Sequence, residues 1–388
     1  MRFKSDVDGM IESGINIQFF LDCFVNKKRI MFLMSFILFL QSCFQENYKN
    51  TMHDKVEINI VDSLIVYPDS DFVNILDFNE SYLFGINTQK DKVFVYEKTG
   101  EIKKIIDQKG EGPNEYNKLA KIGITSHDEI LIADSDKILF FDINSDRVSR
   151  CVFDKENILP IPPDLHISEG NNGMFYFTSS SMKYSPRNEV YFDASHTFTS
   201  FSRDCSFDNL GGYPTKSVYQ ENTIVTAFEP KMHVDPSGER IYQLFPYGKY
   251  IFVYDLSGTL VKSIPTSPDY FGSTIANKEH SLENIIYLLQ KNARYRNIVV
   301  GKEYIILHYL QALPDEDIVK SLARYNKEGR FKRKQFFSIY NLNGEKLGVD
   351  FEDKNISYLI GFDEQDYLWF QSITDDIQVK VYKAKISL

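Results

Sequence analysis

The side chains able to do chemistry are spread along the 388-residue chain without the spacing of a metal or catalytic motif. The histidines are His53, His127, His166, His196, His233, His280 and His308. None forms a His-x-x-x-His pair, and no Gly-x-Ser-x-Gly elbow marks a serine nucleophile. Aspartate-rich segments lack the glycine and closing glutamate of a calcium loop. The sequence therefore predicts no bound cofactor and does not decide whether the protein is an enzyme. A calcium ion held by carboxylates from distant segments stays an alternative.

One stretch stands out by its composition: residues 107–116 read Asp-Gln-Lys-Gly-Glu-Gly-Pro-Asn-Glu-Tyr. Two glycines and a proline force a sharp and rigid bend. It is not a dinucleotide-binding loop, because the third glycine and the following helix are missing. The candidate binding residues of this bend are Gly110, Glu111, Gly112, Pro113, Glu115 and Tyr116. A bend that merely joins two strands is the other interpretation.

A second candidate is a basic run that contrasts with the formal net charge of −10. Arg330, Lys332 and Arg333 belong to this run. It is either a solvated loop or a docking patch for an acidic ligand or a lipid surface. The whole run holds six positive charges, at Arg324, Lys327, Arg330, Lys332, Arg333 and Lys334. Six positive charges in an acidic protein do not make the basic face that nucleic acid requires, so we exclude nucleic-acid binding.

The elements that position these residues are short β-strands in a recurring pattern. From residue 82 onward, a polar turn followed by an apolar run occurs six times. A second signal, an aromatic residue before Asp, Asn, Gly or Ser, closes each third strand. These aromatic residues are Tyr96, Phe141, Phe192, Tyr254 and Tyr340, with Tyr382 as the sixth. Each repeat thus supplies four strands, which predicts an all-β, six-bladed β-propeller.

The sixth repeat is short of an outer strand, whereas a spare strand, residues 55–67, precedes the first repeat. We expect the spare strand to complete the last blade, which closes the ring and removes an exposed edge. Residues 55–388 would then form one propeller.

Insertions lengthen the repeats at residues 179–188, 204–230, 264–295 and 314–334. Each joins either a second strand to a third or an outer strand to the next inner strand. In a propeller these connections leave from one face, so we expect a binding face beside blades three to five. The apolar spacing of Leu282, Ile285, Ile286 and Leu289 predicts a short helical insertion that packs on the propeller, or else waits for a partner helix.

Cys151 and Cys205 are expected at the ends of outer strands in successive repeats. Outer strands of neighbouring blades diverge, so their Cα atoms should lie farther apart than the roughly 7 Å that a disulfide allows. We therefore expect two unpaired thiols.

The N-terminal segment has the order of a secretory signal. Lys27, Lys28 and Arg29 precede an apolar stretch at residues 30–40 that is too short to span a membrane. The Leu-Gln-Ser-Cys43 ending resembles the lipobox of bacterial lipoproteins, which implies cleavage before Cys43 and its diacylation. An apolar strand beside a chance cysteine is the alternative.

These features divide the chain into a leader at residues 1–42, a tether at residues 43–54 and the propeller. Residues 1–26 fit no part of a signal peptide, so we infer that the true start lies close to Lys27. The expected location is the cell envelope, as a membrane-anchored lipoprotein of the outer membrane that faces the periplasm or the surface.

The bend at residues 107–116 also resembles the Gly-x-Gly-Pro-x-Glu-Tyr/Phe signature of six-bladed β-propeller lipoproteins of unknown function. The long insertions and residues 281–350 look like the subgroup with a DUF4221-type domain. This resemblance implies the fold and no activity. We predict a monomeric, lipid-anchored module that binds a ligand or protein partner beside blades three to five. The alternative is a propeller hydrolase or lyase that uses axial carboxylates, with or without calcium.

Overall fold

The computed structural model describes most of the unit Asp54–Leu388. The described residues are 56–66, 73–87, 91–117, 119, 121–134, 137–152, 166–179, 196–213, 230–272, 287, 289–315, 317–318, 333–373 and 379–387. The predicted leader, Cys43 and the tether lie outside them. No helix among these residues is long and apolar enough to cross a membrane.

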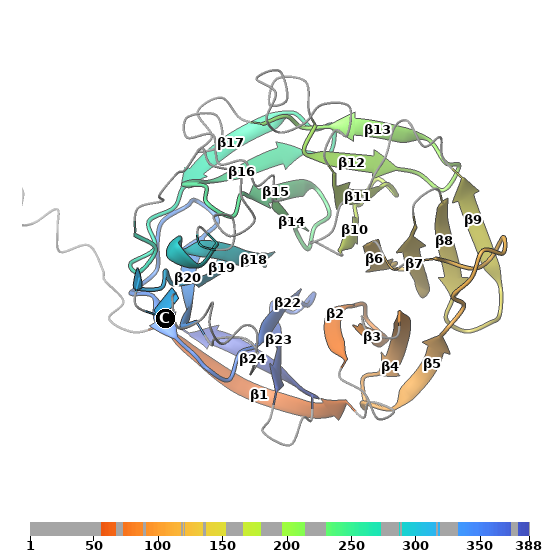
Figure 1. The fold of residues 1–388 in the computed structure, drawn as a ribbon, viewed down its shortest axis with the longest axis horizontal. Helices are drawn as coiled ribbons and strands as arrows, with labels where there is room; N and C mark the ends of the chain where they lie inside the picture. Colours follow the sequence, from red (N-terminus) through yellow and green to blue (C-terminus); the bar gives the residue numbers. More distant parts are fainter. Residues whose placement is uncertain are drawn as a thin grey trace, which may run out of the picture. The chain divides into compact units, whose positions relative to one another are not determined.

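Six four-stranded antiparallel sheets follow one another around a ring, as predicted (Figure 1). Blades one to three contain β2 (Asn74–Phe78), β3 (Tyr82–Asn87), β4 (Lys92–Glu97), β5 (Ile102–Ile106), β6 (Lys121–Ile124), β7 (Glu129–Ala133), β8 (Lys137–Asp142), β9 (Val148–Val152), β10 (Ile167–Glu169), β11 (Phe175–Thr178), β12 (Phe198–Phe201) and β13 (Phe207–Leu210). Blades four and five contain β14 (Lys231–Val234), β15 (Arg240–Leu244), β16 (Tyr250–Asp255), β17 (Leu260–Pro265), β18 (Arg294–Val300), β19 (Tyr304–Leu310), β20 (Gln335–Asn341) and β21 (Phe351–Glu352). Blade six contains β22 (Tyr358–Phe362), β23 (Leu368–Ile373), β24 (Val379–Ser387) and the N-terminal strand β1 (Glu57–Val66).

The burial of each strand follows its place in the blade. The middle strands β3 and β8 are buried along almost their whole length, because both faces of a blade pack against neighbouring blades. The outer strands β5 and β17 are mostly exposed. One core cluster joins Phe84 of blade one to Ile122 of blade two. The core therefore lies between blades rather than within them.

The predicted ring closure is confirmed. Strand β1 pairs antiparallel with β24, from Glu57 opposite Ser387 to Val66 opposite Val379. Val66 is fully buried and joins a core cluster with Val381 and with Val73 of blade one. The N-terminal strand β1 thus closes the ring by pairing with the C-terminal strand β24.

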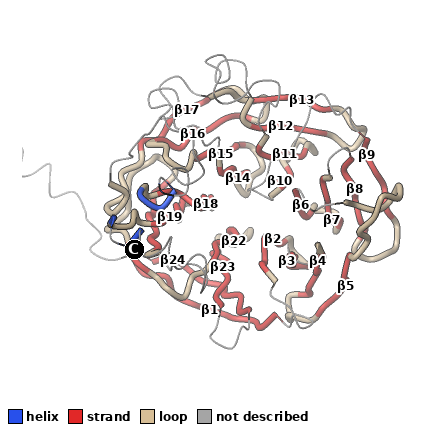
Figure 2. The backbone as a smooth tube through the Cα atoms, viewed as in Figure 1, coloured by secondary structure: helices blue, strands red, loops and turns tan. Residues whose placement is uncertain are grey.

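The connections between second and third strands, and from outer strands to the next inner strands, leave on the same side of the ring, because the strands of each blade are antiparallel and follow in order. We call this side the insert face. The long connections lie where the sequence predicts them: β11 to β12, β13 to β14, β17 to β18, and β19 to β20. Tyr287 and residues 289–291 are helical at the end of the predicted helix (Figure 2), whose earlier residues lie outside the described chain.

Blade three departs from the prediction. Its third strand, β12, ends at Phe201, so Phe201 rather than Phe192 is the aromatic residue that closes it. Phe192 itself lies outside the described residues. The turn after β12 uses Cys205 at a φ of 69°, where blades one, four and five use glycine, so the sequence signal is hidden. The insertion predicted to begin at residue 204 begins after β13, at Gly211.

The expectation of unpaired cysteines is wrong. Cys151 of β9 and Cys205 form a disulfide, with Cα atoms 5.2 Å apart. The physical reason is the position of Cys205, which lies in the turn between β12 and β13 and not on an outer strand. That turn packs on the core cluster that contains Cys151, so the divergence of outer strands does not separate the two residues.

Candidate functional site

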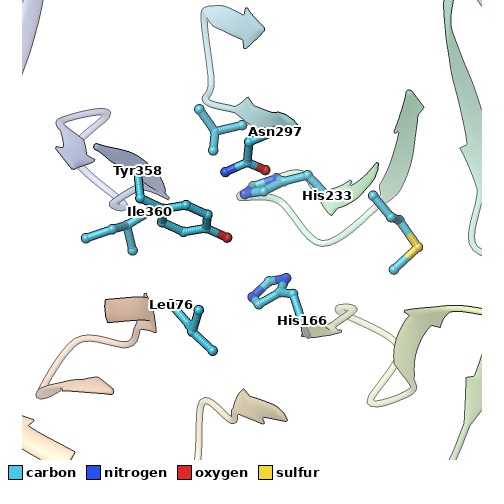
Figure 3. Close-up of a pocket in the computed structure, with 8 residues that line it drawn as sticks. Leu76, His166, His233, Asn297, Tyr358 and Ile360 are labelled. Atoms are coloured by element: carbon cyan, nitrogen blue, oxygen red, sulfur yellow. The ribbon is translucent and has the colours of Figure 1, made fainter. Parts of the chain in front are cut away.

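A pocket lies at the axis of the ring, where the inner strands of five blades meet (Figure 3). Its lining residues are Leu76, His166, Met232, His233, Asn297, Val299, Tyr358 and Ile360. The empty space between them is about 250 Å³ when the part open to solvent is included, but its enclosed part has room for only about one water molecule. The pocket is therefore far smaller than a site for a drug-sized ligand.

Polar side chains converge on this pocket from separate blades. His166, His233, Asn297 and Tyr358 all point into the same space, and the Tyr358 hydroxyl reaches toward its middle (Figure 3). The described lining contains no carboxylate. Among the described residues, no group of three or more His, Cys, Asp and Glu is placed to hold a metal ion. The described lining therefore combines hydrogen-bonding groups with apolar side chains.

His166 is fixed by hydrogen bonds at both ring nitrogens. Its Nε2 lies 2.6 Å from Asp77 Oδ2 on blade one, and its Nδ1 lies 3.1 Å from Ser168 Oγ. A carboxylate, an imidazole and a hydroxyl in this order resemble an acyl-transfer triad. Ser168, however, is 8% exposed and is not among the lining residues of the pocket described here. The contacts therefore fit a cross-link between blades one and three better than a nucleophile.

Asn297 is fixed by its place on the inner strand β18. Its Nδ2 donates to Leu359 O at 2.7 Å, and its Oδ1 accepts from Ile298 N at 2.9 Å. The pairing of β18 with β19 shifts between Tyr295 and Asn297, which places the amide between blades five and six. Sequence reasoning did not single out Asn297, His166 or His233, because an inner strand gives no local signal of which residues face the axis.

The bend at residues 107–116 holds blades one and two together. Tyr116, a candidate binding residue, is instead fully buried, and its hydroxyl donates to Asp91 O (2.7 Å), with Ile106 O of blade one as a second acceptor at 3.1 Å. That placement is a correction, and its reason is the ring of Tyr116, which packs in the core between the two blades. Burial raises the pKa of Tyr116, so the hydroxyl keeps its proton.

The glycines of the bend make room for Glu115. A Cβ on Gly110 or Gly112 would collide with the Glu115 carboxylate, which accepts a hydrogen bond from Gly112 N at 2.8 Å. Lys137 Nζ donates to Gly112 O at 3.0 Å. Of the candidate binding residues in the bend, Glu111, Pro113 and Glu115 are exposed. Their role in binding stays a prediction, whereas the motif itself is accounted for by the turn.

Arg333 points inward and joins two insertions. Its guanidinium donates to Leu289 O (2.7 Å) and Asn292 O (2.7 Å) in the insertion before β18. It also donates to Gln311 O at 2.8 Å, in the insertion after β19. Arg333 is thus a cross-link and not a residue of an exposed docking patch. Arg330 and Lys332 lie outside the described residues.

Further contacts hold the insertion before β18 against blade five. Lys346 bridges Asp269 (2.7 Å), in the insertion before β18, and the buried Asp350 (2.8 Å). Asp350 also accepts hydrogen bonds from Tyr309 (2.5 Å) and Ser338 (2.7 Å). Its burial is offset by these donors and by the lysine charge.

A third contact lies between the two insertions: Tyr287 and Lys291 both donate to Asp315, at 2.9 and 2.7 Å.

Two tyrosines on this side of the ring are exposed, each with 43% of its surface accessible. Tyr250 is the first residue of β16, and Tyr270 lies in the insertion before β18. Tyr270 stacks on Phe336, with ring centroids 4.3 Å apart. The sequence did not reveal either residue as exposed.

Comparison with known proteins agrees with this architecture. Residues 70–227 match the family model DUF5128, described as a 6-bladed β-propeller. This chain is a six-bladed β-propeller. No protein of curated function matches its sequence.

Two solved structures share the fold of the propeller. A DUF4221 family member from Bacteroides vulgatus is 15% identical, with a TM-score of 0.63, over 86% of this chain and 99% of that one. A predicted exported protein of Bacteroides fragilis is 12% identical, with a TM-score of 0.54, over 88% and 98%. The resemblance to six-bladed propellers of unknown function, DUF4221 members included, is therefore confirmed at the level of the fold.

Proposed function

We propose that this propeller is a binding module of the cell envelope and that its ligand or protein partner is held on the insert face beside blades four and five. The observation that supports this most strongly is the bracing of two long insertions against each other. A single side chain, that of Arg333, donates hydrogen bonds to main-chain carbonyls of both insertions. Ordering an insertion costs conformational entropy, and the described residues 289–293 and 311–315 of these two insertions are held together by hydrogen bonds, which favours a preformed recognition surface.

The exposed side chains of this surface fit recognition. Tyr250 and Tyr270 are exposed on a fixed backbone. Tyrosine is enriched at binding hot spots because it offers a large apolar area, a polar tip and few rotatable bonds. Because Tyr250 and Tyr270 lie beside blades four and five, we propose this part of the predicted face beside blades three to five as the partner-binding surface.

Site-specific photo-crosslinking in native envelopes tests this surface. A photoreactive phenylalanine analogue at Tyr250 or Tyr270 should give discrete crosslinked species. The matched control is Ser257, an exposed residue in the turn between β16 and β17, on the opposite face of blade four. Crosslinks of equal yield from Ser257, or none from either tyrosine, would contradict the proposal.

The envelope location is proposed on three grounds. The leader resembles a lipoprotein signal, the Bacteroides fragilis relative is named as an exported protein, and the Cys151–Cys205 disulfide suits an oxidising compartment. We propose that a lipid on Cys43 anchors the chain. Cys43→Ala should move the protein from the membrane pellet to the soluble fraction. An unchanged distribution would refute lipidation.

An enzyme built on axial carboxylates is the other function that the sequence predicts. The described pocket lining offers histidine, asparagine and tyrosine, and the nearby Asp77 is engaged by His166. We therefore propose a binding function rather than a catalytic one. A calcium titration checks the metal-dependent alternative, since a saturable rise in melting temperature that EDTA reverses would restore it.

A further inference from the structure

Tyr270 presents a flat aromatic surface on the insert face. Its ring stacks on that of Phe336, with centroids 4.3 Å apart and planes 26° from parallel, so one face of the Tyr270 ring is covered. Tyr270 nevertheless keeps 43% of its surface accessible, whereas Phe336 beneath it is buried. The exposed part of Tyr270 therefore includes the second face of its ring.

The backbone at Tyr270 is fixed to blade five by hydrogen bonds. Tyr270 N donates to the Tyr309 hydroxyl at 3.2 Å, and Asp269 N donates to Asp350 Oδ2 at 2.7 Å. Asp350 N in turn donates to Asp269 Oδ2 at 2.8 Å. The supporting ring of Phe336 stacks on Tyr309, with centroids 5.7 Å apart. A ligand that stacks on Tyr270 therefore meets a ring already held in place, which keeps the entropic cost of binding low.

An ion pair lies beside this aromatic stack. Glu352 is directly opposite Phe336 in the pairing of β20 with β21, so the two side chains point to the same side of blade five. Lys334 Nζ lies 3.5 Å from Glu352 Oε2, and the two side chains are 63% and 26% exposed. A carboxylate accepts hydrogen bonds and an ammonium group donates them. Because the two charges cancel, the pair offers both to a ligand that carries no charge.

An aromatic face beside an uncharged set of donors and acceptors matches the two sides of a sugar ring. The face of an aromatic ring is electron-rich and attracts the C–H groups on the apolar side of a pyranose. The hydroxyl groups at the edge of the sugar can donate to a carboxylate and accept from an ammonium group.

We propose that Tyr270, Lys334 and Glu352 form a binding site for a neutral carbohydrate. The sugar ring stacks on Tyr270, and its hydroxyl groups form hydrogen bonds with the Lys334–Glu352 pair. This inference names the ligand class of the insert face and rests on the proposed binding function.

A microarray of neutral glycans tests the ligand class, with glycans built from hexose, pentose, deoxyhexose and N-acetylhexosamine units. The original protein should bind at least one of them, and isothermal titration with that glycan measures the dissociation constant. Tyr270→Ala should weaken binding about fivefold or more, because the stacking surface is lost. Tyr270→Phe keeps the ring and should bind within about twofold of the original protein.

Glu352 is exposed, so Glu352→Gln should leave the fold intact while it weakens binding through the loss of charge-assisted hydrogen bonds. The control is Val152→Ala, a change at an exposed apolar residue of β9 in blade two, which should bind like the original protein. The proposal is overturned if no glycan binds, or if Tyr270→Ala has the dissociation constant of the original protein.

The crosslinking experiment separates this inference from the proposed function. Discrete crosslinked proteins from Tyr270 without glycan binding would remove the carbohydrate site and keep the partner surface. Tyr270-dependent glycan binding without crosslinked proteins would keep the carbohydrate site and remove the protein partner.

Discussion

At the scale of single residues, His308 carries the clearest consequence of burial. It lies on β19 with 1% exposure, its ring stacks on Phe337 at 4.7 Å, and its Nε2 lies 3.2 Å from Gln335 Oε1. Burial, with a smaller effect of the Arg296 charge, lowers the pKa of His308 from 6.5 to about 3. The folded protein therefore keeps this ring neutral at pH values where the unfolded chain protonates it.

We predict that His308 makes the propeller sensitive to acid. The free energy of unfolding should fall as pH drops below about 6.5, because the unfolded state then binds one more proton, and the loss should level off near pH 3. At pH 4.5 this residue should cost about 3 kcal/mol. Denaturant unfolding of the original protein and of His308→Gln at pH 7 and 4.5 measures the difference.

The exposed His127 provides the control, because His127→Gln should keep the original pH dependence. If His308→Gln and the original protein lose the same free energy between the two pH values, the histidine is not the acid-sensitive group.

Residue types in the candidate site were visible in the sequence, but their directions were not. Tyr116 belongs to a recognisable motif, yet it faces the core between two blades. Arg333 belongs to a basic run, yet it turns toward carbonyl groups of two insertions. Side-chain direction depends on packing between segments distant in the sequence, which a local pattern does not contain.

At the scale of elements, strand count and closure were predictable because each hairpin carries its own turn residues. Gly100, Gly258 and Gly344 adopt φ values of 91°, 84° and 97° in the turns that follow third strands, where other residues are strained. Blade three lacks this signal, since Cys205 takes the equivalent conformation. The predicted position of β12 was therefore wrong, although the predicted positions of the neighbouring strands were correct.

The closing strand yields a prediction about truncation. A chain that begins at Val73 lacks β1 and leaves the edge of β24 uncovered, including Val381, which is fully buried in the intact ring. We expect a loss of about 5 kcal/mol or more, which is comparable with the stability of a whole domain. Circular dichroism melting should show a broad or absent transition.

The matched control begins at Lys55, so that β1 is kept and the predicted tether is removed. It should melt like a chain that begins at Phe44 and keeps the predicted tether. Cooperative melting of the Val73 chain within a few degrees of this control would show that the ring does not need its N-terminal strand.

At the scale of the whole molecule, the repeats predicted a ring of six blades, but the covalent link between blades two and three was not predictable. The disulfide spans 54 residues in sequence and connects β9 to the turn before β13. It restricts the unfolded chain, which is the main way such a bond stabilises a protein. Cys151→Ser/Cys205→Ser should therefore lower the free energy of unfolding by about 2–4 kcal/mol.

Reduction separates the bond from the substitutions themselves. Dithiothreitol should lower the stability of the original protein toward that of the double variant and leave the variant unchanged, as measured by urea unfolding. Thiol labelling of the original protein before reduction should find Cys151 and Cys205 blocked. Two reactive thiols in protein isolated from the envelope, with no response to dithiothreitol, would contradict the bond and remove one ground for an oxidising compartment. The same result would leave the ring intact, because β1 and β24 close it without a covalent link.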